Sequence, residues 1–96
     1  MLSQKQIDII VHTMLPYNPV KIGVFGSYMR DRNDDRSDIN ILYRFRGPIS
    51  IFQKSDIVEE LKMKLQKNVN LVSEKCISPY LEKQIQQDLV VIYEDK

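Results

Sequence analysis

The chain has 96 residues, which is the size of one small domain, so we expect a single domain over residues 1–96. A content of 43% hydrophobic and 28% charged residues is typical of a globular protein and excludes a disordered or fibrous chain. Fourteen Lys and Arg against 13 Asp and Glu leave a net charge of +1, which argues against nucleic-acid or membrane-surface binding through overall charge.

Several features predict a cytoplasmic location. The longest apolar runs, such as residues 89–93, are far shorter than the roughly 20 residues that cross a bilayer. The first six residues lack the apolar stretch of a signal peptide. The single cysteine, Cys76, cannot form an internal disulfide, so no oxidising compartment is needed.

The first half of the chain predicts a helix and two strands. Ser3 and Gln6 have the spacing of a capping box, and the apolar positions that follow predict a helix over about residues 3–14. The apolar period then changes to two, which predicts strands over 20–25 and 39–45. Residues 28–31 could form a short helix, and the polar residues 31–37 predict an exposed loop.

The second half predicts two further helices, each followed by a strand. Ser55 is a good N-cap for a helix with an apolar face formed by Ile57, Val58, Leu61 and Leu65. A short strand is expected at 69–72 and another at 90–92. Ser78-Pro79 predicts the start of the last helix, whose buried side is expected to hold Leu81, Ile85 and Leu89. The element order predicts an α+β (mixed α/β) domain with one small sheet of about four strands.

The end of the first predicted strand has the residues of a phosphate site. The strand ends at Gly26, and glycine permits close backbone approach to a ligand. The Ser27 hydroxyl, the N–H groups of a helix start and Arg30 one turn later could converge on a phosphate. The alternative is an ordinary strand–turn–helix junction with Ser27 as its N-cap. Arg44 and Arg46, at the end of the second strand, could extend the positive charge of this region.

The start of the second predicted strand has residues that could bind a metal ion. Asp38 and Asn40 are two residues apart, so their side chains point to the same face, roughly 6.5–7 Å apart at the backbone. Two oxygen-bearing side chains in this arrangement can hold a hard cation such as magnesium. The alternative is the usual alternation of polar residues along a half-exposed strand.

Taken together, these segments resemble the nucleotidyltransferase superfamily that includes DNA polymerase beta, and in particular its minimal nucleotidyltransferase, MntA-like antitoxin branch. The family pattern is Gly-Ser, ten residues and Asp-x-Asp, with an arginine three positions after the serine. It is matched here by Gly26, Ser27, Arg30, Ser37, Asp38 and Ile39. Residues 89–94 look like the closing segment of the family, and the resemblance covers nearly the whole chain. It implies the minimal nucleotidyltransferase fold, with helices mostly on one face of the sheet.

The resemblance also implies an activity and its cofactors. In the family, the Gly-Ser turn holds a nucleoside triphosphate such as ATP, and paired aspartates bind two magnesium ions. A third aspartate joins one metal and helps to activate the attacking hydroxyl. Metal ions would offset the charge on the attacking and leaving oxygens. On this basis Asp38 is the candidate catalytic residue and a metal ligand.

The sequence departs from the family pattern at two of the three carboxylates. Asn40 stands at the second aspartate, and Asn70 at the expected third. An asparagine oxygen attracts a divalent ion much less than a carboxylate and cannot act as a base. Glu74 is an alternative third acid, and Asp34 or Asp35 could supply a loop carboxylate.

Two functions remain open. The first is a nucleotidyltransferase that moves a nucleoside monophosphate onto a protein or small-molecule acceptor, with activity weakened by Asn40 and Asn70. The second is a non-catalytic binding module that docks a helical HEPN-type partner, as the resemblance to antitoxins implies. The short chain favours a partner protein or a homo-oligomer in either case.

Overall fold

Four strands form one mixed sheet in the computed structural model, which describes residues 3–26 and 38–95. The strands are β1 (Pro19–Phe25), β2 (Ile39–Phe45), β3 (Val69–Ser73) and β4 (Val90–Glu94). Their order across the sheet is β3-β2-β1-β4. β1 pairs antiparallel with both β2 and β4, whereas β2 and β3 are parallel. The four predicted strands and the mixed α/β class are confirmed.

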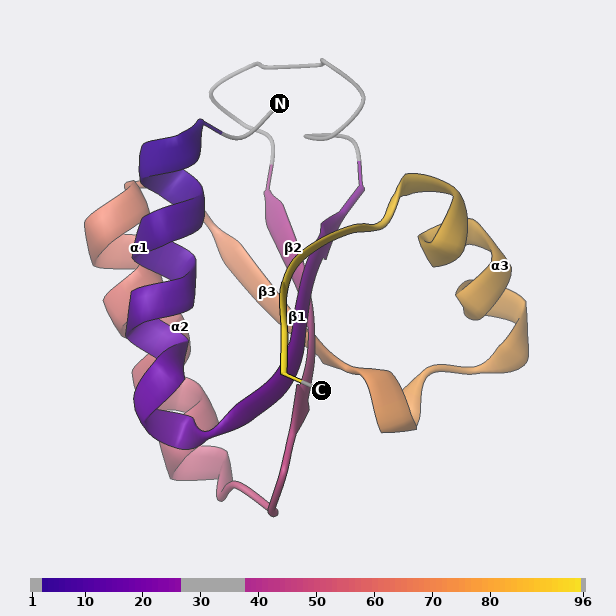
Figure 1. Cartoon of the computed structure of the whole chain (residues 1–96), viewed down its shortest axis with the longest axis horizontal. Helices are drawn as coiled ribbons and strands as arrows, with labels where there is room; N and C mark the ends of the chain where they lie inside the picture. Colours follow the sequence, from indigo (N-terminus) through magenta and orange to yellow (C-terminus); the bar gives the residue numbers. More distant parts are fainter. Residues whose placement is uncertain (1–2, 27–37, 96) are drawn as a thin grey trace.

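Within the described residues, three helices cover the sheet, two on one face and one on the other (Figure 1). They are α1 (Gln4–Met14), α2 (Ile51–Leu65) and α3 (Pro79–Asp88), with short 3-10 turns η1 (Leu15–Tyr17) and η3 (Glu74–Cys76). α1 and α2 lie side by side, and α3 lies on the opposite side of the strands. The predicted helix arrangement, mostly on one face, therefore holds. The predicted helix at 28–31 and loop at 31–37 lie outside the described residues.

The main core lies between the sheet and the α1–α2 pair. Ile10 and Met14 of α1 and Leu61 of α2 are fully buried, and they form one cluster with Ile39 and Ile41 of β2. Complete burial of each such side chain stabilises the fold by roughly 1.5–3 kcal/mol. Successive side chains of a strand point to opposite faces of the sheet. Asn40, between these two isoleucines, therefore points to the face that α3 covers.

Helix starts follow the capping chemistry of the sequence, with one correction. Ser3 and Gln6 form the predicted capping box of α1. α2 begins earlier than predicted, because its capping box is Ser50 and Gln53. Ser55 is therefore not an N-cap but a residue inside the helix. The change adds residues 51–55 to the helix. The apolar ones among them, Ile51 and Phe52, are exposed, so they do not belong to the apolar face that was used to place the helix.

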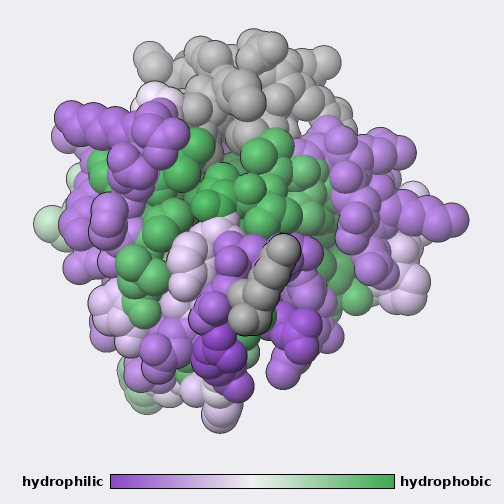
Figure 2. All heavy atoms as spheres, viewed as in Figure 1, coloured by the Kyte–Doolittle hydropathy of each residue, from purple (hydrophilic) through white to green (hydrophobic). Residues whose placement is uncertain are grey.

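α3 covers its face of the sheet less completely than the sequence predicts. Ser78 caps the helix and Pro79 begins it, as expected. Ile85 is buried, but Leu81 is 49% exposed, so its predicted burial is wrong. Figure 2 shows hydrophobic residues at the centre of this view, between the hydrophilic outer surfaces of α1 and α3. Within residues 3–26 and 38–95, no helix is both long and apolar enough to cross a lipid bilayer.

Candidate functional site

Gly26 forms a tight corner at the end of β1. Its φ is +103°, a backbone conformation that L-residues rarely adopt. A Cβ atom at this position would lie 2.5 Å from Nδ2 of Asn40 on the neighbouring strand. The conformation therefore favours glycine, and a Cβ would also force the Asn40 side chain to move. Because Gly26 has no side chain, its backbone lies directly beside the polar residues at the start of β2.

Asp38, Asn40 and Asn70 come together beside this corner. Asn40 and Asn70 are register partners in the parallel pair β2–β3. Nδ2 of Asn70 donates to Oδ1 of Asn40 at 3.1 Å and to Oδ2 of Asp38 at 3.4 Å. The structure thus brings together the three residues that the sequence places at the first, second and third acids of the family pattern.

The donor set of this cluster does not fit a pair of magnesium ions. Asp38 is its only carboxylate, and the two other members are neutral amides. Asn70 presents its amide nitrogen to the cluster, and N–H hydrogens carry partial positive charge and cannot bind a cation. Among the residues that the structure describes, no group of three or more His, Cys, Asp or Glu side chains could hold a metal ion.

A mostly apolar cavity lies next to the corner, on the α3 side of the sheet. Its volume is about 320 Å³, and it is lined by Phe25, Gly26, Val72, Leu81, Gln84, Ile85 and Asp88. Gly26 belongs both to the corner and to the cavity, so the two are continuous. Sequence reasoning missed this cavity because it assigned Leu81 to the packed side of α3. The exposed position of Leu81 in the structure is what leaves the space open.

The remaining candidates lie elsewhere. Ser27, Arg30, Asp34 and Asp35 lie outside the described residues, so their predicted roles stay predictions. Glu74, the alternative third acid, pairs with Lys21 at 3.2 Å and Arg44 at 3.8 Å. Arg44 and Arg46 lie at the far end of β2 from Asp38, so they do not extend the charge near Gly26.

The fold and the position of this cluster define a nucleotidyltransferase domain. A family model described as "Polymerase beta, Nucleotidyltransferase" matches residues 5–96. The chain therefore belongs to the polymerase beta nucleotidyltransferase family.

Relatives within the family point to its protein adenylyltransferases. The "Putative protein adenylyltransferase MJ0126" of Methanocaldococcus jannaschii is 35% identical over 77 residues, covering 79% of each chain. The "Protein adenylyltransferase MntA" of Thermococcus cleftensis is 31% identical over 72 residues, covering 75% of this chain and 73% of the relative. The predicted resemblance to the MntA-like branch is confirmed.

Solved structures share the fold at lower sequence identity. A toxin–antitoxin crystal structure with AMP-PNP has a TM-score of 0.78 and 21% identity, covering 99% of this chain and 76% of the other. A Shewanella oneidensis complex of a tri-AMPylated HEPN toxin with its MNT antitoxin has a TM-score of 0.77 and 19% identity, covering 98% and 74%. These similarities confirm the minimal nucleotidyltransferase fold.

Proposed function

We propose that this chain binds a nucleoside triphosphate, transfers its nucleotide slowly or not at all, and acts in complex with a helical HEPN-type partner. The observation that carries the proposal is the hydrogen-bonded cluster of Asp38, Asn40 and Asn70. An amide donor stands in it where the family pattern has a metal-binding carboxylate. Asp38 and Asn40 thus each receive a hydrogen bond from a neutral amide in place of a bound cation.

The nucleotide would lie across the Gly26 corner. We assign the phosphates to the backbone at Gly26, the Ser27 hydroxyl and the Arg30 guanidinium, in keeping with the family pattern. The apolar cavity beside Gly26 would receive the base, because a planar, weakly polar ring suits walls such as Phe25 and Leu81. ATP is the expected ligand, since named relatives are protein adenylyltransferases.

Metal-dependent transfer should be weak in this chain. In the family, magnesium supplies charge neutralisation at the reacting phosphate. The Asp38 carboxylate could serve as a metal ligand or as a base. The amides of Asn40 and Asn70 carry no negative charge and cannot accept a proton near neutral pH. Retention of Asp38 is the observation that favours a second candidate function, which is slow adenylyl transfer to a protein acceptor.

The partner is inferred from the structural relatives. One of them is described as an MNT antitoxin bound to a HEPN toxin that carries three AMP groups. We propose by analogy that this chain docks a HEPN-type protein, with or without modifying it. Docking needs only the fold, so it would survive the loss of two carboxylates.

The proposal is tested by titrating ATP into the purified chain, by calorimetry, with magnesium or with EDTA. We expect weak binding that differs by less than about threefold between the two conditions, because one carboxylate gives little metal affinity. Substituting both Asn40→Asp and Asn70→Asp should make binding depend on magnesium, whereas the Asn18→Asp control at the far end of β1 should not. A loss of more than about tenfold in EDTA for the unchanged chain would contradict the proposal.

A further inference from the structure

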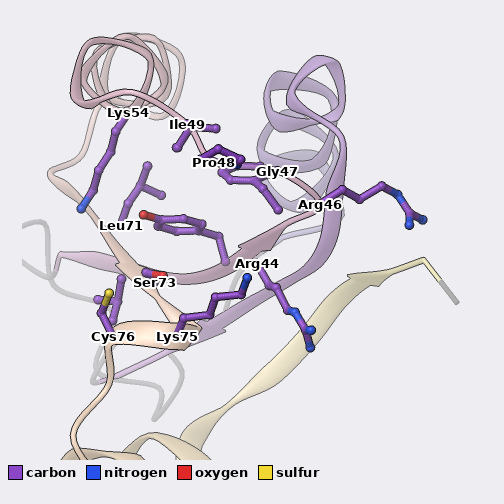
Figure 3. A pocket seen from close by; sticks show the side chains of 13 residues that line it. Arg44, Arg46, Gly47, Pro48, Ile49, Lys54, Leu71, Ser73, Lys75 and Cys76 are labelled. Carbon is purple, nitrogen blue, oxygen red and sulfur yellow. The ribbon is translucent and has the colours of Figure 1, made fainter.

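A second cavity lies at the other end of the strands that carry the polar cluster. It has a volume of about 590 Å³ and is bounded by the C-terminal parts of β2 and β3, residues 46–49, α2 and η3 (Figure 3). The cluster of Asp38, Asn40 and Asn70 lies near the opposite ends of β2 and β3. Because β2 has seven residues, about 20 Å of strand separates its two ends. This cavity shares Val72 with the apolar cavity beside Gly26, but none of its other lining residues belongs to the proposed nucleotide site.

Positive charge gathers around this cavity, although the whole chain carries only +1. Four of its lining residues are cationic and none is acidic: Arg44, Arg46, Lys54 and Lys75. Arg44 faces Glu74 at 3.8 Å and Arg46 pairs with Asp95, so these two charges are partly neutralised. Lys54 and Lys75 form no ion pair with any residue that the structure describes.

Lys54 and Lys75 approach the cavity from different elements. Lys54 extends from α2 and Lys75 from η3, on either side of Leu71 and Ser73 (Figure 3). Nζ of Lys54 also lies 5.9 Å from the ring centre of Tyr43, within cation–π range, which favours a side-chain position at the cavity. The two ammonium groups lie on opposite sides of the cavity in Figure 3, so positive charge borders it on both sides.

The rest of the lining is suited to a ligand with an apolar body. Pro48, Ile49 and Leu71 form apolar walls, and Ser73 supplies a hydroxyl. A phosphate monoester carries a charge of about −1.5 to −2 on three oxygens, so it suits two ammonium groups and a hydroxyl better than a singly charged carboxylate does. A cavity of about 590 Å³ is large enough for a small molecule.

We propose that this cavity is a second binding site, which takes a small organic phosphate with an apolar or aromatic group. Lys54 and Lys75 bind its phosphate, and the walls formed by Pro48, Ile49 and Leu71 cover its apolar part. Binding here does not require metal or transfer at Asp38, so the site stands or falls independently of the proposed function.

The test is an NMR titration of the ¹⁵N-labelled full chain with phenyl phosphate, inorganic phosphate and benzoate. We expect phenyl phosphate to shift the amides of residues 47, 49, 54 and 71–76. Its affinity should be at least about tenfold higher than that of inorganic phosphate, which lacks the apolar part, or of benzoate, which lacks the third oxygen. Equal affinity of the three probes, or shifts confined to the surroundings of Gly26, would overturn the proposal.

Charge-matched variants sharpen the test. Combining Lys54→Gln with Lys75→Gln should weaken phenyl phosphate binding by at least about tenfold. Lys5→Gln, an exposed lysine on α1, should leave it unchanged. If the lysine pair can be replaced without loss of affinity, these lysines do not bind the phosphate and the proposal is refuted. If Lys5→Gln weakens binding equally, the attraction is general and the proposal is refuted as well. An unchanged amide spectrum away from the cavity will verify that each variant is folded.

Discussion

Asn70 on β3 donates its side-chain amide to Oδ1 of its register partner Asn40 on β2, at 3.1 Å. The same nitrogen lies 3.4 Å from Oδ2 of Asp38. Two neighbouring parallel strands are therefore joined by a neutral polar contact at the place where the family pattern puts carboxylates around magnesium. This contact links the fold to the proposed loss of metal-dependent chemistry.

The Gly26 corner should not tolerate a side chain. Gly26→Ala places a Cβ 2.5 Å from Nδ2 of Asn40 at a φ of +103°, so we expect a loss of at least about 1 kcal/mol in the free energy of unfolding and weaker ATP binding. Gly47→Ala is the matched control, because no atom lies within 4 Å of its added Cβ. Urea denaturation measures both. Equal stability of the two variants would show that the corner is not constrained.

The cavity beside Gly26 should respond to a charge on its wall. Leu81→Asp introduces a carboxylate where we expect the base, so ATP affinity should fall roughly tenfold. Tyr80→Asp, which is 77% exposed on the same helix and does not line this cavity, should leave affinity nearly unchanged. Both positions are solvent-exposed, so folding should be preserved. The base assignment is wrong if the two variants bind ATP equally well.

The assignment of the ATP phosphates to Ser27 and Arg30 can be tested by substituting each residue and measuring affinity. Ser27→Ala should lower ATP affinity severalfold, and Arg30→Ala by about ten- to a hundredfold, because a charge-assisted hydrogen bond is the stronger of the two. Tripolyphosphate, which has no base, should lose affinity in the same proportion. Calorimetry with both ligands measures this. Unchanged tripolyphosphate affinity would place the phosphates elsewhere.

The start of α2 gives a prediction about stability alone. Ser50→Ala removes the hydroxyl that accepts from the backbone N–H of Gln53 at 3.1 Å, so it should cost about 1 kcal/mol. Ser55→Ala, inside the helix and exposed, should be neutral or slightly stabilising because alanine has the higher helix propensity. Thermal denaturation compares the stability of the two variants. A larger loss of stability for Ser55→Ala than for Ser50→Ala would show that Ser55 is the N-cap after all.

Much of the fold could be predicted because it depends on local patterns. The alternation around Ile39 and Ile41 defined β2 and its buried face, and Ser78-Pro79 defined the start of α3. The start of α2 was misplaced because Ile51 and Phe52 extend the helix without contributing to its buried face. Periodicity detects the packed part of a helix, whereas the exposed first turn is determined by capping alone.

The candidate site was predictable in its members but not in its contacts. Spacing and family pattern indicated Gly26, Asp38, Asn40 and Asn70, since each lies at a strand end. The direction of the Asn70 amide depends on side-chain hydrogen bonding across two strands, which one-dimensional patterns do not contain. The two cavities depend likewise on long-range packing, through the exposed Leu81 and through residues from four segments around Lys54.

The central claim is that Asn40 and Asn70, in place of two metal-binding carboxylates, make adenylyl transfer by this chain slower than in the family. Its most direct test is adenylyl transfer from labelled ATP with magnesium to a HEPN-type protein, by the unchanged chain and by the combined Asn40→Asp and Asn70→Asp variant. We predict transfer by the combined variant at least about a hundredfold faster, because two added carboxylates restore charge for the metal. Transfer by the unchanged chain at a rate within about threefold of that variant would contradict the account.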